Sequence, residues 1–336
     1  MLKIPEGRKL DCIPVGRLAI DINPADMTES FAECLHFKKY VGGSPANTAV
    51  GLAKLGARAG FIGKVSSDSL GDFAVDYVKN LGVDVTNVSR APKEVPIGLA
   101  FTETLNGKTN LMMYRNSQVA DLLLSPADVN EEYIASARSI VISGTALSAS
   151  PSRDACFKAL ELAKKHGLLI IFDIDYRSQV WQNPDEISVY YTLAAKYAHI
   201  IMGSREEYDL MDHIAGDSWT DKQTAERWFA ENAEIIIIKH GSEGSMAYVK
   251  GGDSYRVHIV PVNMLKSTGG GDAYSSAFLY GLLSGRDVKN CLELATTSAS
   301  LAVAAPCCSD AMVGLDVLED VLTRARTEHG ELVVKL

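Results

Sequence analysis

A glycine-rich stretch in the last quarter of the chain carries the residues best suited to chemistry. Gly269, Gly270 and Gly271 precede Asp272, and small or apolar residues then recur at helical spacing, at Tyr274, Ala277, Phe278, Gly281 and Leu282. Glycines allow a ligand close to the backbone, and the N-terminus of a helix attracts negative charge. A carboxylate beside such a loop can take a proton from an attacking hydroxyl. The stretch favours phosphoryl transfer with Asp272 as general base, although glycine runs more often form plain turns.

Polar residues at the ends of expected strands are the next candidates. Asp21 follows a first strand at 12–16, Arg177 follows a strand at 168–173, and Lys239 ends a strand at 235–239. Ligands bind at the carboxyl ends of strands in open parallel sheets. Asp21 could equally cap a turn, and Arg177 could equally form a surface ion pair. Asn47 lies in the first turn of a helix after two glycines, where its amide can bind a polyol.

The elements that would position these residues alternate along the chain. Apolar strands are expected at 139–143, 168–173, 198–202 and 235–239, and helices at 151–166, 185–196, 205–214 and 221–232. Strands this apolar, alternating with helices, predict a parallel sheet covered on both faces. A hairpin is expected over 245–260, with Gly251-Gly252 at its turn, and a helix over 288–305.

Two segments, at about 18–41 and 95–118, differ from the rest. They carry short alternating runs, with a turn expected at Asn106-Gly107. We expect a small β-sheet that projects from the main body as a lid. Phe101, Leu111 and Met113 are expected to form one exposed apolar face of this sheet, which would favour a homodimer through the lid.

Composition narrows the class of protein. The 336 residues are 47% hydrophobic and 22% charged, which suits a single globular domain over 1–336. The net charge of −9 comes without a basic stripe, so no nucleic-acid partner is expected. No apolar run is long enough for a membrane span, and the first residues lack a signal-peptide core. Six scattered cysteines predict reduced thiols in the cytoplasm, although the Cys307-Cys308 pair could be redox-active.

Several catalytic motifs are missing from the sequence. It contains no GxxxxGK[ST] phosphate loop, no GxGxxG after the first strand, no HExxH or paired CxxC, and no GxSxG. A dehydrogenase, a zinc enzyme and a serine hydrolase are therefore disfavoured. Phosphoryl transfer remains the best chemistry.

Taken together, these segments resemble the ribokinase-like (PfkB) family of carbohydrate kinases over essentially the whole chain. Residues 42–47, 52–56 and 63–71 are similar to the N-terminal signature of the family. Residues 267–272 are similar to its C-terminal signature, DTxGAGD. The two signatures occur in the right order and at the right spacing, which makes the resemblance specific.

The resemblance implies an α/β Rossmann-like core, a central mostly parallel sheet flanked by helices, and a small β-sheet lid. It implies ATP and Mg²⁺, an anion hole at Gly269, Gly270 and Gly271, and Asp272 as the base. Sugar contacts would be Asp21, Gly43 and Asn47. The nucleotide would be bordered by Ser204, Glu207, Lys239, Gly241, Gly244 and Thr268, with Glu207 organising Mg²⁺ indirectly.

The chain departs from the family pattern at three positions. Lys266 replaces the usual Asp, Gly270 the usual Ala, and Ser204 the Asn of the NxxE motif that contains Glu207. The first departure puts a family-type monovalent-cation (K⁺) site in doubt. The other two are mild.

The substrate is expected to be a keto-deoxy sugar acid. Residues 173–181 resemble the DxNxRxxLW motif of family members that act on such acids, and Arg115 and Arg177 would hold the carboxylate. The C-terminal third, including Asp310 beside the substrate, resembles members that phosphorylate the C6 hydroxyl of 5-dehydro-2-deoxy-D-gluconate in myo-inositol catabolism. The alternatives are a 2-dehydro-3-deoxygluconate kinase, a fructokinase or a ribokinase. From another class, a non-catalytic sugar- or nucleotide-binding regulator stays open.

Overall fold

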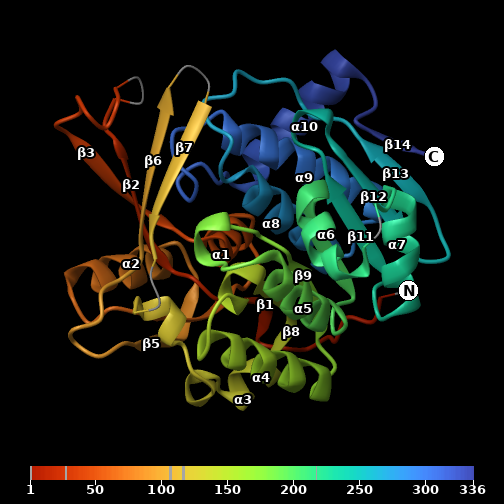
Figure 1. Ribbon diagram of the computed structural model, residues 1–336. Helices are drawn as coiled ribbons and strands as arrows, with labels where there is room; N and C mark the ends of the chain where they lie inside the picture. Colours follow the sequence, from red (N-terminus) through yellow and green to blue (C-terminus); the bar gives the residue numbers. More distant parts are fainter. Residues whose placement is uncertain (1, 27–28, 106–107, 116–117, 217) are drawn as a thin grey trace.

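The computed structural model describes residues 2–26, 29–105, 108–115, 118–216 and 218–336. A central sheet has the strand order β14-β13-β12-β11-β10-β9-β8-β1-β4-β5 (Figure 1). Seven of its strands are parallel: β1 (Leu10–Val15), β4 (Gly60–Val65), β5 (Asp84–Arg90), β8 (Ala137–Ser143), β9 (Leu169–Asp173), β10 (Ile200–Ser204) and β11 (Ile235–Lys239). The antiparallel edge is formed by β12 (Ser245–Val249), β13 (Ser254–Val257) and β14 (Val333–Lys335). The predicted mostly parallel sheet and the hairpin are confirmed.

Helices cover both faces of this sheet, as strands buried on both sides require (Figure 1). One face packs against α3 (Glu131–Ala135), α4 (Ser152–Lys165), α5 (Pro184–Ala195), α6 (Arg205–Met211) and α7 (Asp221–Ala230). The other packs against α1 (Ser44–Lys54), α2 (Ser69–Asn80), α8 (Gly270–Leu283), α9 (Val288–Val303) and α10 (Leu315–His329). The helix predicted over 205–214 ends earlier, at Met211, and a short 3₁₀ turn at His213–Ala215 follows it. No helix among the described residues is long and apolar enough to cross a membrane.

The predicted lid is a second sheet with the order β3-β2-β6-β7. Its strands are β2 (Ala19–Pro24), β3 (Phe37–Gly42), β6 (Leu99–Leu105) and β7 (Lys108–Tyr114), and they project beyond the helices (Figure 1). Asp21 therefore lies within a lid strand rather than in a loop after β1. The predicted turn at Asn106-Gly107 falls outside the described residues.

The prediction that Phe101, Leu111 and Met113 share one face of the lid is wrong, because the strand register separates them. Phe101 pairs with Met112, whereas Leu111 pairs with Thr102 and Met113 with Ala100. Side chains alternate between the two faces of a strand, so Phe101 points away from the side that carries Leu111 and Met113. Leu111 and Met113 line a cavity instead. The predicted homodimer gains no support from this set of residues.

The helix that begins with the glycine stretch is held between two neighbours. Helix α8 packs on α9, and its residues Ala277 and Phe278 are fully buried. It also crosses α1 closely at Gly51: a Cβ atom there would lie 2.3 Å from the hydroxyl oxygen of Ser276. This close crossing fixes the first turn of α1 relative to the first turn of α8.

We therefore expect Gly51→Ala to lower the free energy of unfolding by about 1–3 kcal/mol, because the added methyl overpacks the crossing. In a Ser276→Gly background the same substitution should be neutral or stabilising, since alanine favours a helix. Urea unfolding of the four proteins in this double-mutant cycle provides the measurement. An equal loss in both backgrounds would show that the crossing does not require the glycine.

Candidate active site

A cavity of about 60 Å³ lies between the lid and the carboxyl ends of the central strands. This is the edge of a parallel sheet where ligands bind. The structure brings these predicted site residues to its lining: Asp21, Gly43, Asn47, Arg177, Thr268, Gly269 and Asp272. Residues far apart in the sequence therefore meet at one place.

Asp272 lies in the first turn of α8 and is 8% exposed. Asn47, in the first turn of α1, donates a hydrogen bond from Nδ2 to the Oδ2 of Asp272 over 2.8 Å. Burial and the nearby charge of Asp175 raise the pKa of Asp272 to about 7, while Asn47 and Arg177 act to lower it. A carboxylate with a pKa near neutrality is matched to accepting a proton from a hydroxyl.

A second aspartate in the cavity, Asp175, has a pKa that is shifted in the opposite direction. It accepts hydrogen bonds from the hydroxyls of Ser143 at 2.8 Å and Thr145 at 3.2 Å, and it pairs with Arg177 at 2.8 Å. Burial acts to raise the pKa of Asp175, but Arg177 and the two hydroxyls outweigh it and the pKa is lowered. Two buried carboxyls with pKa values pushed apart are typical of an acid–base site.

Sequence reasoning did not include Asp175 among the site residues. Its φ of 40° is the one positive value recorded for a non-glycine residue in the described chain. Such backbone conformations concentrate at functional sites. The alternating aspartates Asp173 and Asp175 after a buried strand were the signal that could have identified it.

The glycine stretch forms the N-terminus of α8 without any side-chain cap. Gly269 has a φ of 86°, and a Cβ there would lie 2.8 Å from the Sγ of Cys308, so a larger residue would be strained. The first N–H groups of a helix have no partners within it. They are therefore free to bind an anion beside Asp272.

Lys266 lies beside this loop and is 2% exposed. Its ammonium donates to the carbonyl oxygen of Thr268 and lies 3.6 Å from the Sγ of Cys308. A Cβ at Gly269 would lie only 3.2 Å from the Lys266 Nζ. The substitution of Lys for Asp thus places a buried positive charge against the glycine loop.

Gly43 begins α1 with a φ of 104°. A Cβ there would lie 2.3 Å from the backbone oxygen of Arg17, so only glycine fits. This contact brings the start of α1, with Asn47, against the segment between β1 and β2.

Of the predicted nucleotide-side residues, Thr268 lines the cavity, and the others lie at or near the neighbouring strand ends, outside that lining. Ser204 ends β10 and forms a capping box with Glu207, whose two carboxylate oxygens each accept a backbone N–H at 2.7 Å, from Tyr176 and Ser204. Lys239 ends β11, and its Nζ lies 3.7 Å from the Oδ1 of Asp173. A Cβ at Gly271 would lie 3.5 Å from that Nζ, so this edge adjoins the glycine loop.

The short turn after Lys239 carries the remaining predicted glycines. Gly241 begins a 3₁₀ turn, Gly241–Glu243, and has open space around its Cβ position. Gly244 ends the turn with a φ of 90°, and a Cβ there would lie 2.0 Å from the oxygen of Val257. Gly244 is therefore explained by packing against β13, and a nucleotide contact remains a prediction for both.

Two predicted substrate residues are not brought to the cavity. Arg115 is buried behind the lining, where it forms an ion pair with Asp121 at 2.7 Å. Asp310 is exposed and bonded to the hydroxyl of Tyr77. Arg115 already has its charge balanced, and Asp310 points to a different surface, so neither contacts the cavity directly in this geometry.

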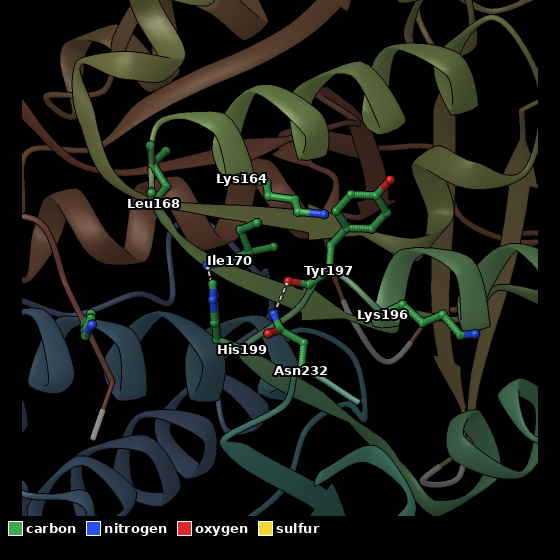
Figure 2. Close-up of a pocket in the computed structure, with 9 residues that line it drawn as sticks. Lys164, Leu168, Ile170, Lys196, Tyr197, His199 and Asn232 are labelled. Carbon is green, nitrogen blue, oxygen red and sulfur yellow. Dashed lines mark hydrogen bonds between the residues drawn. The ribbon is translucent and has the colours of Figure 1, made fainter. Parts of the chain in front are cut away.

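A larger cavity of about 430 Å³ lies at the opposite edge of the sheet (Figure 2). Lys164, Lys196 and His199 surround it, at the end of α4, just after α5 and just before β10. None of the predicted site residues lines it. The amino ends of parallel strands are not where such sheets bind substrates, so the smaller cavity is the candidate active site.

Comparison with known proteins agrees with this fold. The model of the pfkB family of carbohydrate kinases matches residues 9–313. The chain therefore belongs to this family and is a carbohydrate kinase.

Individual relatives cover nearly the whole chain. A protein of Clostridium perfringens named 5-dehydro-2-deoxygluconokinase is 49% identical over 335 residues, or 99% of both chains. An Escherichia coli structure termed a ribokinase II, in complex with ATP and Mg²⁺, has a TM-score of 0.83 at 23% identity, over 94% of this chain and 99% of that one. A double mutant of Vibrio cholerae fructokinase, with fructose, ADP and potassium bound, has a TM-score of 0.80 at 22% identity, over 94% and 100%.

The Asn47–Asp272 contact predicts a pH effect. The hydrogen bond from Asn47 lowers the pKa of Asp272, so Asn47→Ala should raise that pKa further. Because the base must be ionised, the acidic limb of the kcat/KM profile for phosphoryl transfer should move to higher pH. Asn80→Ala, at the exposed end of α2, serves as the control and should leave the limb in place. An unmoved limb in Asn47→Ala would contradict the assignment of that limb to Asp272.

Proposed function

We propose that this kinase transfers the γ-phosphoryl group of ATP to the C6 hydroxyl of 5-dehydro-2-deoxy-D-gluconate. The observation that carries the chemistry is Asp272, buried with a pKa raised to about 7 at the uncapped N-terminus of α8. The relative named 5-dehydro-2-deoxygluconokinase, which shares 49% identity over 99% of both chains, supports the substrate.

In this mechanism Asp272 accepts the proton of the C6 hydroxyl while the hydroxyl oxygen attacks the γ-phosphorus of ATP and ADP leaves. Asn47 holds the Asp272 carboxylate through its Nδ2 and thereby orients the base. Asp175 stays ionised because Arg177 is bound to it, so Asp272 is the carboxyl whose proton affinity suits the transfer. The proton ends on Asp272 and the phosphoryl group on the sugar.

Negative charge on the transferring group would be met by the amides of Gly269, Gly270 and Gly271 and by the dipole of α8. Lys239 lies against Gly271 and would add a positive charge on the nucleotide side. These groups are fixed before the reaction, so no reorganisation is needed when the charge moves.

The residues fit Mg²⁺-ATP at this edge. The uncapped helix N-terminus and Lys239 suit polyphosphate, with Ser204, Gly241, Gly244 and Thr268 along its border. Both carboxylate oxygens of Glu207 already accept backbone N–H groups, so Glu207 suits an indirect role toward the metal. When bound, Mg²⁺ neutralises charge on the phosphates.

The sugar would lie between the main body and the lid. Asp21 and Asn47 offer acceptors and donors for its hydroxyls, and Leu111 and Met113 cover it from β7. A cavity of about 60 Å³ has room for only a few water molecules, so the lid must move outward to admit a six-carbon sugar acid. Closure then excludes water and limits hydrolysis of ATP.

Positive charge beside the anion hole is supplied by Lys266 in our proposal. Potassium is bound in the fructokinase double mutant of Vibrio cholerae. In this chain the buried Lys266 ammonium contacts the carbonyl of Thr268 at the loop itself. We propose that this fixed cation makes a K⁺ ion unnecessary.

The alternative substrates are 2-dehydro-3-deoxygluconate, fructose and ribose. The first would differ from 5-dehydro-2-deoxy-D-gluconate in single hydroxyl contacts, and the two neutral sugars lack a carboxylate. A sugar-binding regulator is the alternative of another class. Placement in the cytoplasm is kept as part of the proposal, supported by six free cysteines and by the use of ATP. A homodimer through the lid stays a prediction.

Release of ADP from Mg²⁺-ATP with each of these four sugars tests the proposed function. We expect 5-dehydro-2-deoxy-D-gluconate to give the highest kcat/KM, by at least about tenfold over the neutral sugars, because hydrogen bonds to a charged group are worth about 1.5–3 kcal/mol. Preference for fructose or ribose would contradict the acid substrate. Sugar binding without ADP release from any of them would favour the regulator.

The role of Lys266 is tested by replacing potassium chloride with tetramethylammonium chloride at equal ionic strength. We expect the same turnover in both salts, because the Lys266 ammonium is already in place. Lys266→Met should lower turnover in either salt, while Lys3→Met, on an exposed N-terminal side chain remote from the site, should not. Strong activation of the unaltered protein by potassium would contradict the proposal.

A further inference from the structure

Three arginines lie at or beside the substrate cavity, and they differ in how their donors are used. The Nε and Nη2 of Arg115 lie 2.8 and 2.7 Å from the Oδ2 of Asp121. The Arg115 side chain is 1% exposed. Arg177 gives Nη2 to Asp175 and Nη1 to the backbone oxygen of Tyr176. Each of these two arginines already holds a carboxylate of the protein.

Arg17 is different. It follows β1, lines the cavity and is only 7% exposed. Its Nε and Nη2 are buried and have no hydrogen-bond partner in the described part of the protein. These two nitrogens form one edge of the guanidinium, with their N–H bonds side by side, which is the edge that grips a carboxylate with two parallel hydrogen bonds.

Leaving these donors unpaired is unfavourable, because a buried polar group without a partner loses its hydration and forms no hydrogen bond in return. The nearby carboxylates do not remove the deficit. Asp121 and Asp175 are ion-paired with Arg115 and Arg177, and no ion pair joins Asp21 to Arg17 among the described residues. Two unsatisfied donors on a side chain that lines a cavity call for a ligand from outside the chain.

We propose that Arg17 binds the carboxylate of the sugar acid, with Nε and Nη2 donating to its two oxygens. This inference rests on the proposed function, since it assigns the recognition of the acid group within the same site. It replaces the predicted pair of Arg115 and Arg177 as the direct carboxylate ligand. Arg177 then acts by holding Asp175, and Arg115 by holding Asp121.

The charged groups around Arg17 differ from those around Arg177. Burial lowers the pKa of Arg17, and the acids that act on it are Asp21, Asp121 and Asp175. Asp272 instead acts on Arg177.

The experiment compares 5-dehydro-2-deoxy-D-gluconate with its C1 amide, which keeps the shape but removes the negative charge. The unaltered protein should prefer the acid by about 10- to 100-fold in kcat/KM, as expected for charged hydrogen bonds. Arg17→Met should lose that preference, mainly through a higher KM for the acid, with little change for the amide. Arg17→Lys should keep part of it, because a lysine retains the charge but cannot span both oxygens.

Arg177→Met is the matched comparison, because it removes the other arginine of the cavity lining. Retention of the acid preference in Arg17→Met, or its loss in Arg177→Met alone, would overturn the assignment while leaving the proposed function intact. If the unaltered protein shows no preference for the acid, the proposed substrate fails and this proposal fails with it. If Arg17→Met does not fold, Arg17→Lys decides, and an unchanged acid-to-amide ratio in that variant would overturn the assignment.

Discussion

The hydrogen bond between Asn47 and Asp272 is the interaction on which the rest of the site depends. It joins the first turns of α1 and α8, two helices whose close crossing is set by Gly51 and Ser276. Both helices begin with a glycine of positive φ, Gly43 and Gly269, a backbone conformation that glycine adopts at no steric cost. Burial and the charge of Asp175 raise the pKa of Asp272, and in our proposal the Asn47 hydrogen bond orients its carboxylate toward the attacking hydroxyl.

Around this contact the cavity keeps a balance of buried charge. Asp175 is held ionised by Arg177, and Arg115 and Asp121 form a closed pair behind the lining. The buried ammonium of Lys266 donates to the carbonyl oxygen of Thr268, and Nε and Nη2 of Arg17 have no partner among the described residues. These positive groups suit two anionic substrates, ATP and a sugar acid, even though the chain as a whole carries a net charge of −9.

Much of this arrangement could be predicted from local patterns. Apolar runs separated by amphipathic segments predict the parallel sheet, and the glycine stretch before Asp272 predicts the site, because both signals lie within a few residues. The partner of Arg115, the conformation of Asp175 and the register of the lid could not be predicted in this way, although Arg17 and Asp175 both follow strands and so carry a local signal. The partner of Arg115 is fixed by tertiary packing, the φ of Asp175 has no sequence signature, and Phe101 was placed on the wrong face because the strand register was unknown. Arg17 follows the first strand as Asp21 does, so the rule for strand ends applies equally to it.

The most direct test of the account is single-turnover phosphoryl transfer by Asp272→Asn, with sugar binding measured in parallel. Asparagine keeps the size of the side chain but cannot accept the proton. The account predicts a fall in turnover of about 10³-fold or more, with a sugar dissociation constant changed only a few-fold. Turnover close to that of the unaltered protein, with the sugar bound normally, would contradict Asp272 as the base.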